Sequence, residues 1–192
     1  MPPFELVSPP KKIDSRFFNP DGTANDRLRN VANKVREDYQ LITTSEEEML
    51  GMYVVGSSAK GNFHDNSDLD INIWGKVGYS RGTEISNALC DMSNQLTQHF
   101  PKLREMGIDP ENPDINMLQK LGLMAEDEKQ PSLIKALDRL GVIKKADMID
   151  VVVFGQVPWG QVFDLKDEQW KKYRDGTQES PGSLSNYFKH GF

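Results

Sequence analysis

Two acidic residues stand one position apart in a segment that alternates polar and apolar side chains. Asp68 and Asp70 alternate with Leu69, Ile71 and Ile73. Successive side chains of a β-strand point to opposite faces, so the pattern predicts a strand whose two carboxylates project together while the apolar side chains enter the core. Two carboxylates in one small space repel each other unless a cation lies between them. Oxygen ligands favour magnesium or manganese, and we therefore expect Asp68 and Asp70 to be metal ligands.

A third acidic residue, Asp150, stands alone in the apolar run from Met148 to Phe154. This run predicts a central strand, where an unpaired carboxylate would cost several kcal/mol, on the order of the burial penalty of a charged group. Asp150 is therefore a candidate third metal ligand. The alternative is a structural acid paired with a nearby lysine or arginine.

A turn that could hold a phosphate precedes the paired acids. The apolar run Met52 to Val55 predicts a buried strand, and Gly56 then lets the chain turn sharply. Ser57 and Ser58 follow at a predicted helix start, where backbone N–H groups and hydroxyls can bind an anion. The alternative for Ser57 is a helix cap without ligand. A phosphate site facing three acids is the arrangement used for metal-assisted transfer at a nucleoside triphosphate.

The elements that must position these residues follow from periodicity. Apolar residues at spacings of three and four predict helices from about residue 25 to 42, from Thr83, a candidate cap, to Leu96, and from Pro131 to Leu140. Between them lie the three strands described above. We expect an α+β domain over residues 23–155 with an irregular, proline-containing insertion at 101–130, preceded by a proline-rich arm at 1–22 that either wraps the domain or stays mobile.

Residues 156–192 are predicted to be a tail that packs on the domain. Aromatic and basic residues mix in the run from Trp170 to Arg174, and further aromatic residues stand at Tyr187, Phe188 and Phe192. Such a mixture could contact a nucleobase or an RNA end. The alternative is a final helix that packs against the domain.

Composition limits the class of protein. The chain has 192 residues, a formal net charge of −6 and a single cysteine, so it predicts one domain without an internal disulfide. The acidic residues concentrate between positions 45 and 155, which argues against general binding to duplex nucleic acid. No apolar run is long enough for a membrane span and the N-terminus lacks the pattern of a signal peptide, so the expected location is cytoplasmic.

Two other phosphate or acyl-transfer motifs fail in the same segment. A Walker A loop needs a lysine after Gly61, where the sequence has Asn62. A nucleophile elbow centred on Ser58 needs a glycine at the position of Lys60. Neither motif is therefore present in this segment.

The order of these residues resembles the nucleotidyltransferase superfamily typified by DNA polymerase beta. Val55 precedes Gly56 and Ser57, ten residues intervene, and the acid–apolar quartet from Asp68 to Ile71 follows. The motif is most similar to small bacterial and antibiotic-modifying nucleotidyltransferases. The resemblance implies a mixed or antiparallel sheet flanked by helices. It also implies two magnesium ions held by Asp68, Asp70 and Asp150, with the turn from Gly56 to Ser58 binding the triphosphate.

The expected reaction follows from that resemblance. A magnesium- or manganese-dependent enzyme would transfer a nucleoside monophosphate from a triphosphate, with ATP expected, to a hydroxyl group and release pyrophosphate. Asp150 would help to activate this hydroxyl. A small molecule or a protein is the expected acceptor, and an RNA or DNA 3′ end is the alternative. A different class also remains open, an inactive nucleotide-binding module or toxin–antitoxin partner.

Overall fold

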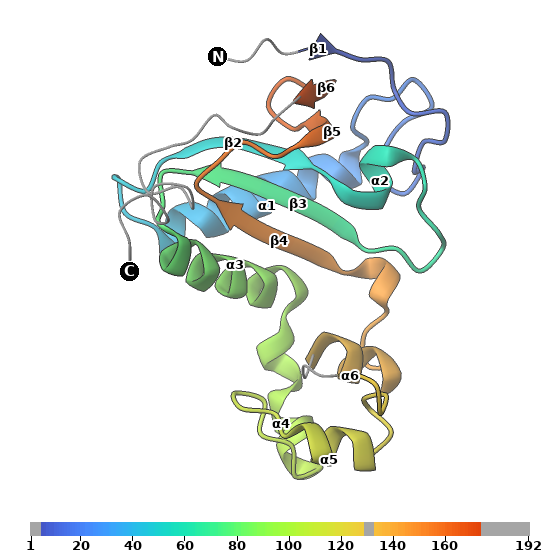
Figure 1. The fold of residues 1–192 in the computed structure, drawn as a ribbon, viewed down its shortest axis with the longest axis vertical. Helices are drawn as coiled ribbons and strands as arrows, with labels where there is room; N and C mark the ends of the chain where they lie inside the picture. Colours follow the sequence, from blue (N-terminus) through green and yellow to red (C-terminus); the bar gives the residue numbers. More distant parts are fainter. Residues whose placement is uncertain (1–4, 129–132, 174–192) are drawn as a thin grey trace.

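The computed structural model describes residues 5–128 and 133–173, which build one mixed six-stranded sheet with helices against it (Figure 1). The strands are β1 Glu5–Leu6, β2 Met49–Val54, β3 Leu69–Gly75, β4 Ile149–Phe154, β5 Gly160–Asp164 and β6 Gln169–Tyr173, in the spatial order β1-β6-β5-β2-β3-β4. The pair β3–β4 is parallel and the other pairs are antiparallel. The fold is therefore α+β, as the sequence predicted.

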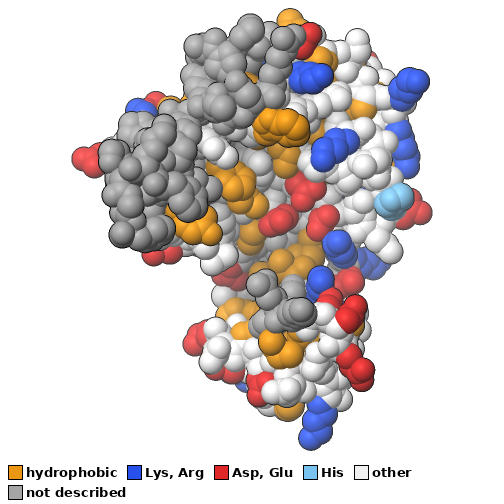
Figure 2. Space-filling view, in the orientation of Figure 1, with side chains coloured by type: hydrophobic (Ala, Val, Ile, Leu, Met, Phe, Trp, Pro, Cys, Tyr) orange, Lys and Arg blue, Asp and Glu red, His pale blue; other side chains and the backbone are white. Residues whose placement is uncertain are grey.

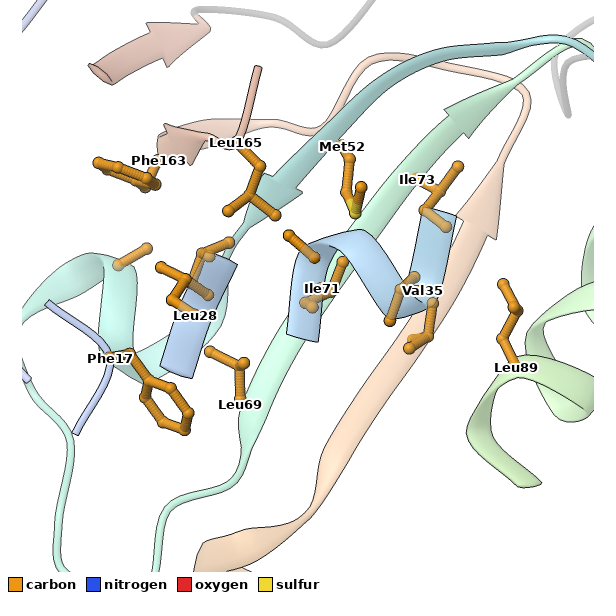
Figure 3. Packing of buried hydrophobic residues seen from close by; sticks show 14 of the residues in the cluster. Phe17, Leu28, Val35, Met52, Leu69, Ile71, Ile73, Leu89, Phe163 and Leu165 are labelled. Carbon is orange, nitrogen blue, oxygen red and sulfur yellow. The ribbon is translucent and has the colours of Figure 1, made fainter. Parts of the chain in front are cut away.

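Two long helices cover one face of the sheet. They are α1 Asp26–Ile42 and α3 Tyr79–Asn94, and their buried side chains form one core with β2, β3, β4 and β5 (Figure 3). Leu28 and Val35 of α1 and Leu89 of α3 are fully buried there against Ile71 and Ile73 of β3. The 3.6-residue period of the helices and the two-residue period of β3 thus meet at a single apolar layer.

The start of α1 agrees with the start predicted from the sequence, whereas the start of α3 differs from its prediction. Asn25 caps α1, because its side chain accepts a hydrogen bond from the N–H of Leu28. The predicted cap Thr83 lies inside α3, which begins four residues earlier at Tyr79. A Cβ at Gly82 would lie 2.9 Å from the carbonyl oxygen of Val153, so the glycine allows α3 to lie close to β4.

The described residues between α3 and β4 form several short helices, which corrects the prediction of an irregular insertion at 101–130. This segment contains η1 Leu96–His99, α4 Phe100–Glu105, α5 Ile115–Lys120, α6 Leu133–Arg139 and η2 Lys145–Asp147, and its described residues, 95–128 and 133–147, are called the helical lobe below (Figure 1). Pro101 lies in the first turn of α4, where a proline removes no hydrogen bond. Leu103, Leu118 and Leu137 are fully buried in a core separate from that of the sheet.

The N-terminal arm wraps the domain over residues 5–22. β1 pairs with β6 and forms one edge of the sheet, and Phe17 and Phe18 are buried in the sheet's core. Of the two alternatives for this segment, wrapping is therefore observed in its described part.

The predicted tail begins with a hairpin rather than a helix. Residues 160–173 form β5 and β6, and Trp170 packs on Phe18 and Phe163 with ring centroids 5.1 and 5.0 Å away. Trp170 and Lys171 are buried, so the proposed contact of this run with a base or RNA end is wrong for these two residues. Arg174, Tyr187, Phe188 and Phe192 lie outside the described residues. Within the described part of the chain, no helix has the length and apolar character needed to cross a membrane.

Candidate active site

Asp70 and Asp150 occupy facing positions on the two parallel strands. In the register of β3 and β4, Asp70 pairs with Asp150, so their side chains leave the sheet on the same face. The residues around Asp70 on β3, Leu69 and Ile71, are fully buried in the core on the other face. The alternation read from the sequence thus places both acids on the face opposite α1, on strands about 4.8 Å apart.

Asp68 directly precedes β3 and completes the acidic group. Burial raises the pKa of Asp70 to about 6, and the negative charges of Asp68 and Asp150 add to the increase. Lys145 of the helical lobe opposes this, and its Nζ lies 3.8 Å from an oxygen of Asp68. Among the described residues, no ion pair involves Asp70 or Asp150. The alternative of a structural ion pair for Asp150 therefore finds no support in residues 5–128 and 133–173.

The glycine turn lies directly beside Asp70. Gly56 has φ +66°, and a Cβ built on it would overlap Oδ2 of Asp70. The backbone N–H of Ser57 donates a hydrogen bond to Asp70 and counteracts part of the increase in its pKa. The position therefore requires glycine for two reasons, its left-handed backbone and the closeness of the carboxylate. The structure thus brings Gly56 and Ser57 together with Asp70.

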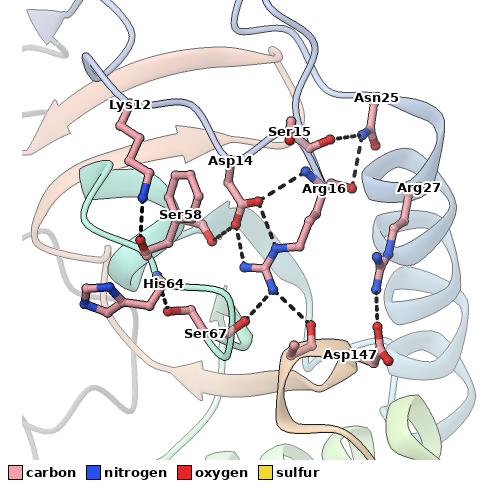
Figure 4. Close-up of polar contacts among 12 residues, drawn as sticks. Lys12, Asp14, Ser15, Arg16, Asn25, Arg27, Ser58, His64, Ser67 and Asp147 are labelled. Atoms are coloured by element: carbon pink, nitrogen blue, oxygen red, sulfur yellow. Dashed lines mark hydrogen bonds and ion pairs between the residues drawn. The ribbon is translucent and has the colours of Figure 1, made fainter.

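Ser58 does not share this position. Its side chain is fully buried and its Oγ donates a hydrogen bond to Oδ2 of Asp14 at 3.0 Å (Figure 4). The Ser58 hydroxyl therefore binds a carboxylate of the chain itself, and the predicted binding of a phosphate by Ser58 stays a prediction. The reason is local: α2, Gly56–Lys60, is a single short turn whose second serine points inward.

Asp150 lies next to α3 as well as next to Asp70. The Sγ of Cys90 is 3.4 Å from its Oδ1, and burial raises the pKa of this thiol to about 12, so Cys90 is a neutral neighbour. In the described residues, no three His, Cys, Asp or Glu side chains are already grouped closely enough to hold one metal ion. Asp70 and Asp150 therefore lie at paired positions of neighbouring strands. The carboxylate of Asp150 also contacts Cys90 of α3.

The surface above these strands has a mixed charge pattern. Figure 2 shows acidic side chains gathered in the middle of one face, above the helical lobe, with Lys or Arg side chains beside them. Cations that surround a group of acids can attract an anionic ligand to a site that the acids alone would repel. This arrangement suits a ligand that brings both phosphate and a divalent cation.

Sequence reasoning missed three residues around the acids. Lys145 reaches Asp68 from the helical lobe, and Asp14 and Arg16 bond to the segments that carry the site (Figure 4). No motif marks them, because they are far from Asp68 in sequence and become neighbours only through the fold. An acidic and a basic residue two positions apart in a proline-rich arm gave the only signal.

The chemistry available at this place is narrow. Carboxylate oxygens are the ligands that magnesium and manganese prefer, and the donor set of Asp68, Asp70 and Asp150 fits such an ion by type and charge. Asp70 is the clearest indication, since a carboxylate with a raised pKa gains the most from a neighbouring cation. The residues present therefore fit metal-assisted chemistry on a phosphorylated ligand.

Comparison with known proteins agrees with this geometry. The family model described as "Nucleotidyltransferase domain" matches residues 28–176 of the chain. This range includes the glycine turn, all three acids and the whole helical lobe. A search of curated proteins and a search of solved structures returned no match.

Proposed function

Because the chain belongs to the nucleotidyltransferase domain family, we propose that it is an enzyme that transfers a nucleoside monophosphate from a triphosphate to a hydroxyl group. In this reaction the acceptor oxygen forms a bond to the α-phosphorus, the bond to the β-phosphate oxygen breaks, and pyrophosphate leaves. The proposed cation is magnesium or manganese, and ATP is the proposed triphosphate. A small molecule or a protein side chain is the proposed acceptor, because a chain of net charge −6 repels a long phosphate backbone.

One observation carries the proposal: Asp70 lies between Asp150 and the turn at Gly56 and Ser57. The register pairs it with Asp150, and the N–H of Ser57 donates to it. A triphosphate bound at the turn would therefore lie within reach of the acids. A group of acids alone, or a glycine turn alone, would not favour this reaction over simple ion binding.

Each residue has a distinct proposed role. Asp68, Asp70 and Asp150 would hold the magnesium ions, which neutralise charge on the triphosphate and on the leaving group when bound. Gly56 leaves room for the carboxylate of Asp70, and Ser57 binds the phosphates of the leaving group. Asp150 would in addition accept the proton of the attacking hydroxyl.

Pyrophosphate release tests the proposal. The purified protein is incubated with magnesium, each of the four triphosphates and a cell extract freed of its own pyrophosphatase activity. We expect release above that of the extract alone, and loss of at least about 100-fold in Asp68→Ala/Asp70→Ala, as for removal of metal ligands. Asp127→Asn, which changes an exposed acid of the helical lobe, is the matched control and should retain activity.

The outcomes separate the three function classes. Turnover that needs an added small molecule or protein supports the proposal. Turnover that needs an RNA or DNA 3′ end would identify the nucleic-acid end as the acceptor instead. Triphosphate binding in calorimetry without pyrophosphate release identifies a binding module. Undiminished turnover in the double variant contradicts the assignment of the acids.

A further inference from the structure

One guanidinium group in the N-terminal arm ties together the segments that carry the site. Nε and Nη2 of Arg16 donate to the two carboxylate oxygens of Asp14 at 2.9 and 2.7 Å (Figure 4). Nη1 of the same side chain donates to two backbone carbonyls, that of Ser67 at 2.7 Å and that of Ala146 at 3.1 Å. Asp14 also accepts the hydroxyl of Ser58 at 3.0 Å. The Arg16 side chain donates four hydrogen bonds, and its partner Asp14 accepts a fifth from Ser58. Together they join the arm to the three segments that contain Ser58, Ser67 and Ala146.

These segments are the ones that lead into the acids. Ser67 directly precedes Asp68, and Ala146 lies in the turn that leads to β4 and Asp150. The first backbone hydrogen bond between the two segments, from the N–H of Leu69 to the carbonyl of Met148, is 3.0 Å long. Arg16 therefore acts at the point where the pairing of β3 with β4, and with it the register of Asp70 and Asp150, begins.

The geometry requires an arginine. A planar guanidinium can bind a carboxylate along one edge and two carbonyls with its remaining nitrogen, whereas an ammonium group has three donors at one point. Asp14 fixes the orientation of this fork and is itself fully buried. Although burial raises its pKa, the hydrogen bonds from Arg16 and Ser58 hold the pKa of Asp14 below its ordinary value. Asp14 thus remains charged and keeps Arg16 in place.

We propose that Arg16, oriented by Asp14, is a positioning residue that holds Asp68 and Asp150 in the relative arrangement needed for nucleotidyl transfer. This inference rests on the function proposed above and deepens it. The Arg16 side chain bonds to Asp14 and to the carbonyls of Ser67 and Ala146, so it would act through the backbone ahead of the two acids. A misplacement of reacting groups by about 1 Å can cost roughly 100-fold in rate, so a loosened register would affect turnover more than triphosphate binding.

The test compares Arg16→Lys with Arg27→Lys. Arg27 is a matched control: its guanidinium faces the ring of Phe17 at 4.9 Å, that of Arg16 faces the same ring at 5.3 Å, and Arg27 pairs with the exposed Asp147 at 3.2 Å. We expect Arg16→Lys to lower kcat by roughly 10- to 100-fold with little change in KM for the triphosphate. We also expect the amide of Leu69 to exchange with solvent roughly tenfold faster or more. Arg27→Lys should alter neither quantity.

The two measurements separate the inference from the proposed function. Equal kcat in the two lysine variants, with wild-type turnover intact, overturns the inference and leaves the function. If the wild type shows no turnover, the proposed function fails. The exchange rate of the Leu69 amide then decides whether Arg16 holds the two strands in register, and an unchanged rate in Arg16→Lys overturns the inference as well. Should Arg16→Lys not fold, Asp14→Asn/Arg16→Gln replaces the charged pair by neutral amides, and the same drop in kcat is expected.

Discussion

At the residue scale, Gly56 and Asp70 depend on each other. The glycine has a positive φ and lies where any Cβ would overlap the carboxylate of Asp70. Sequence alone located both residues, because a glycine after an apolar run and alternating acids are local patterns. The contact between Gly56 and Asp70 could not be predicted from the sequence, because it depends on how β2 and β3 pair.

Gly56→Ala should abolish activity while costing little more stability than a control. The control is Gly141→Ala, because Gly141 has the same φ of +66° but open space around its Cβ position. Both changes should lower the free energy of unfolding by about 1–2 kcal/mol, the cost of a left-handed alanine. Only Gly56→Ala displaces the carboxylate, so only this variant should lose pyrophosphate release. Equal activity in the two variants would show that the contact with Asp70 is unimportant.

Asp70→Asn should stabilise the protein at neutral pH in the absence of metal. The pKa of Asp70 in the folded state is about 6, above the ordinary 3.8, so the folded state binds the proton more tightly. That stabilisation is complete at low pH and is lost as the pH rises through about 6. We expect urea unfolding to show a gain of about 1–2 kcal/mol for Asp70→Asn at pH 8, reduced for solvent screening, that disappears below about pH 4. A gain independent of pH would contradict the assigned pKa.

At the element scale, α3 completes the hydrogen bonding of the edge strand β4. Ser86, Cys90 and Asn94 stand at four-residue intervals on α3 and bond to backbone groups of Val153, Val151 and Ile149. Covering an edge in this way prevents a further strand from pairing with it. Periodicity predicted the apolar side of α3 but not this polar side, because it does not show which helix faces a strand edge.

Asn94→Ala should therefore loosen the strand that carries Asp150. The side chain of Asn94 accepts from the N–H of Ile149 at 2.9 Å and donates to its carbonyl at 2.7 Å. Leaving both groups unpaired should cost about 1–3 kcal/mol and speed exchange of the Ile149 amide. Asn87→Ala, on the exposed surface of the same helix, is the control. Unchanged stability in Asn94→Ala would mean that water replaces the side chain fully.

At the scale of the whole molecule, the described residues form two large apolar cores, apart from a small cluster around Tyr53 and Val162. One lies between the sheet and α1 with α3, and the other lies inside the helical lobe. The sheet and its family could be predicted, because their signals are local. Of the lobe, the sequence predicted α6 as the helix from Pro131 to Leu140. It did not predict α4 and α5, because these helices are short and acquire their apolar environment only from the rest of the lobe. The position of the helical lobe matters for the site, because Lys145 of the lobe lies 3.8 Å from the carboxylate of Asp68.

Leu137→Ala should open the helical lobe without opening the sheet. Leu137 is fully buried in the lobe core, and its truncation should cost about 2–5 kcal/mol there. Native-state hydrogen exchange should accelerate in α4, α5 and α6 while the amides of β2 and β3 keep their protection. Ile71→Ala, in the core of the sheet, should reverse this pattern. Equal acceleration in both regions after Leu137→Ala would show a single cooperative unit.

The position of a label in the triphosphate tests the central claim most directly. The protein is incubated with magnesium, cell extract and ATP that carries the label at either the α- or the γ-phosphate, and modified products are identified by mass spectrometry. Nucleotidyl transfer predicts that the α-label enters an acceptor as a monophosphate adduct while the γ-label leaves as pyrophosphate. Transfer of the γ-label to an acceptor, or adduct formation that survives in Asp68→Ala/Asp70→Ala, would contradict the account.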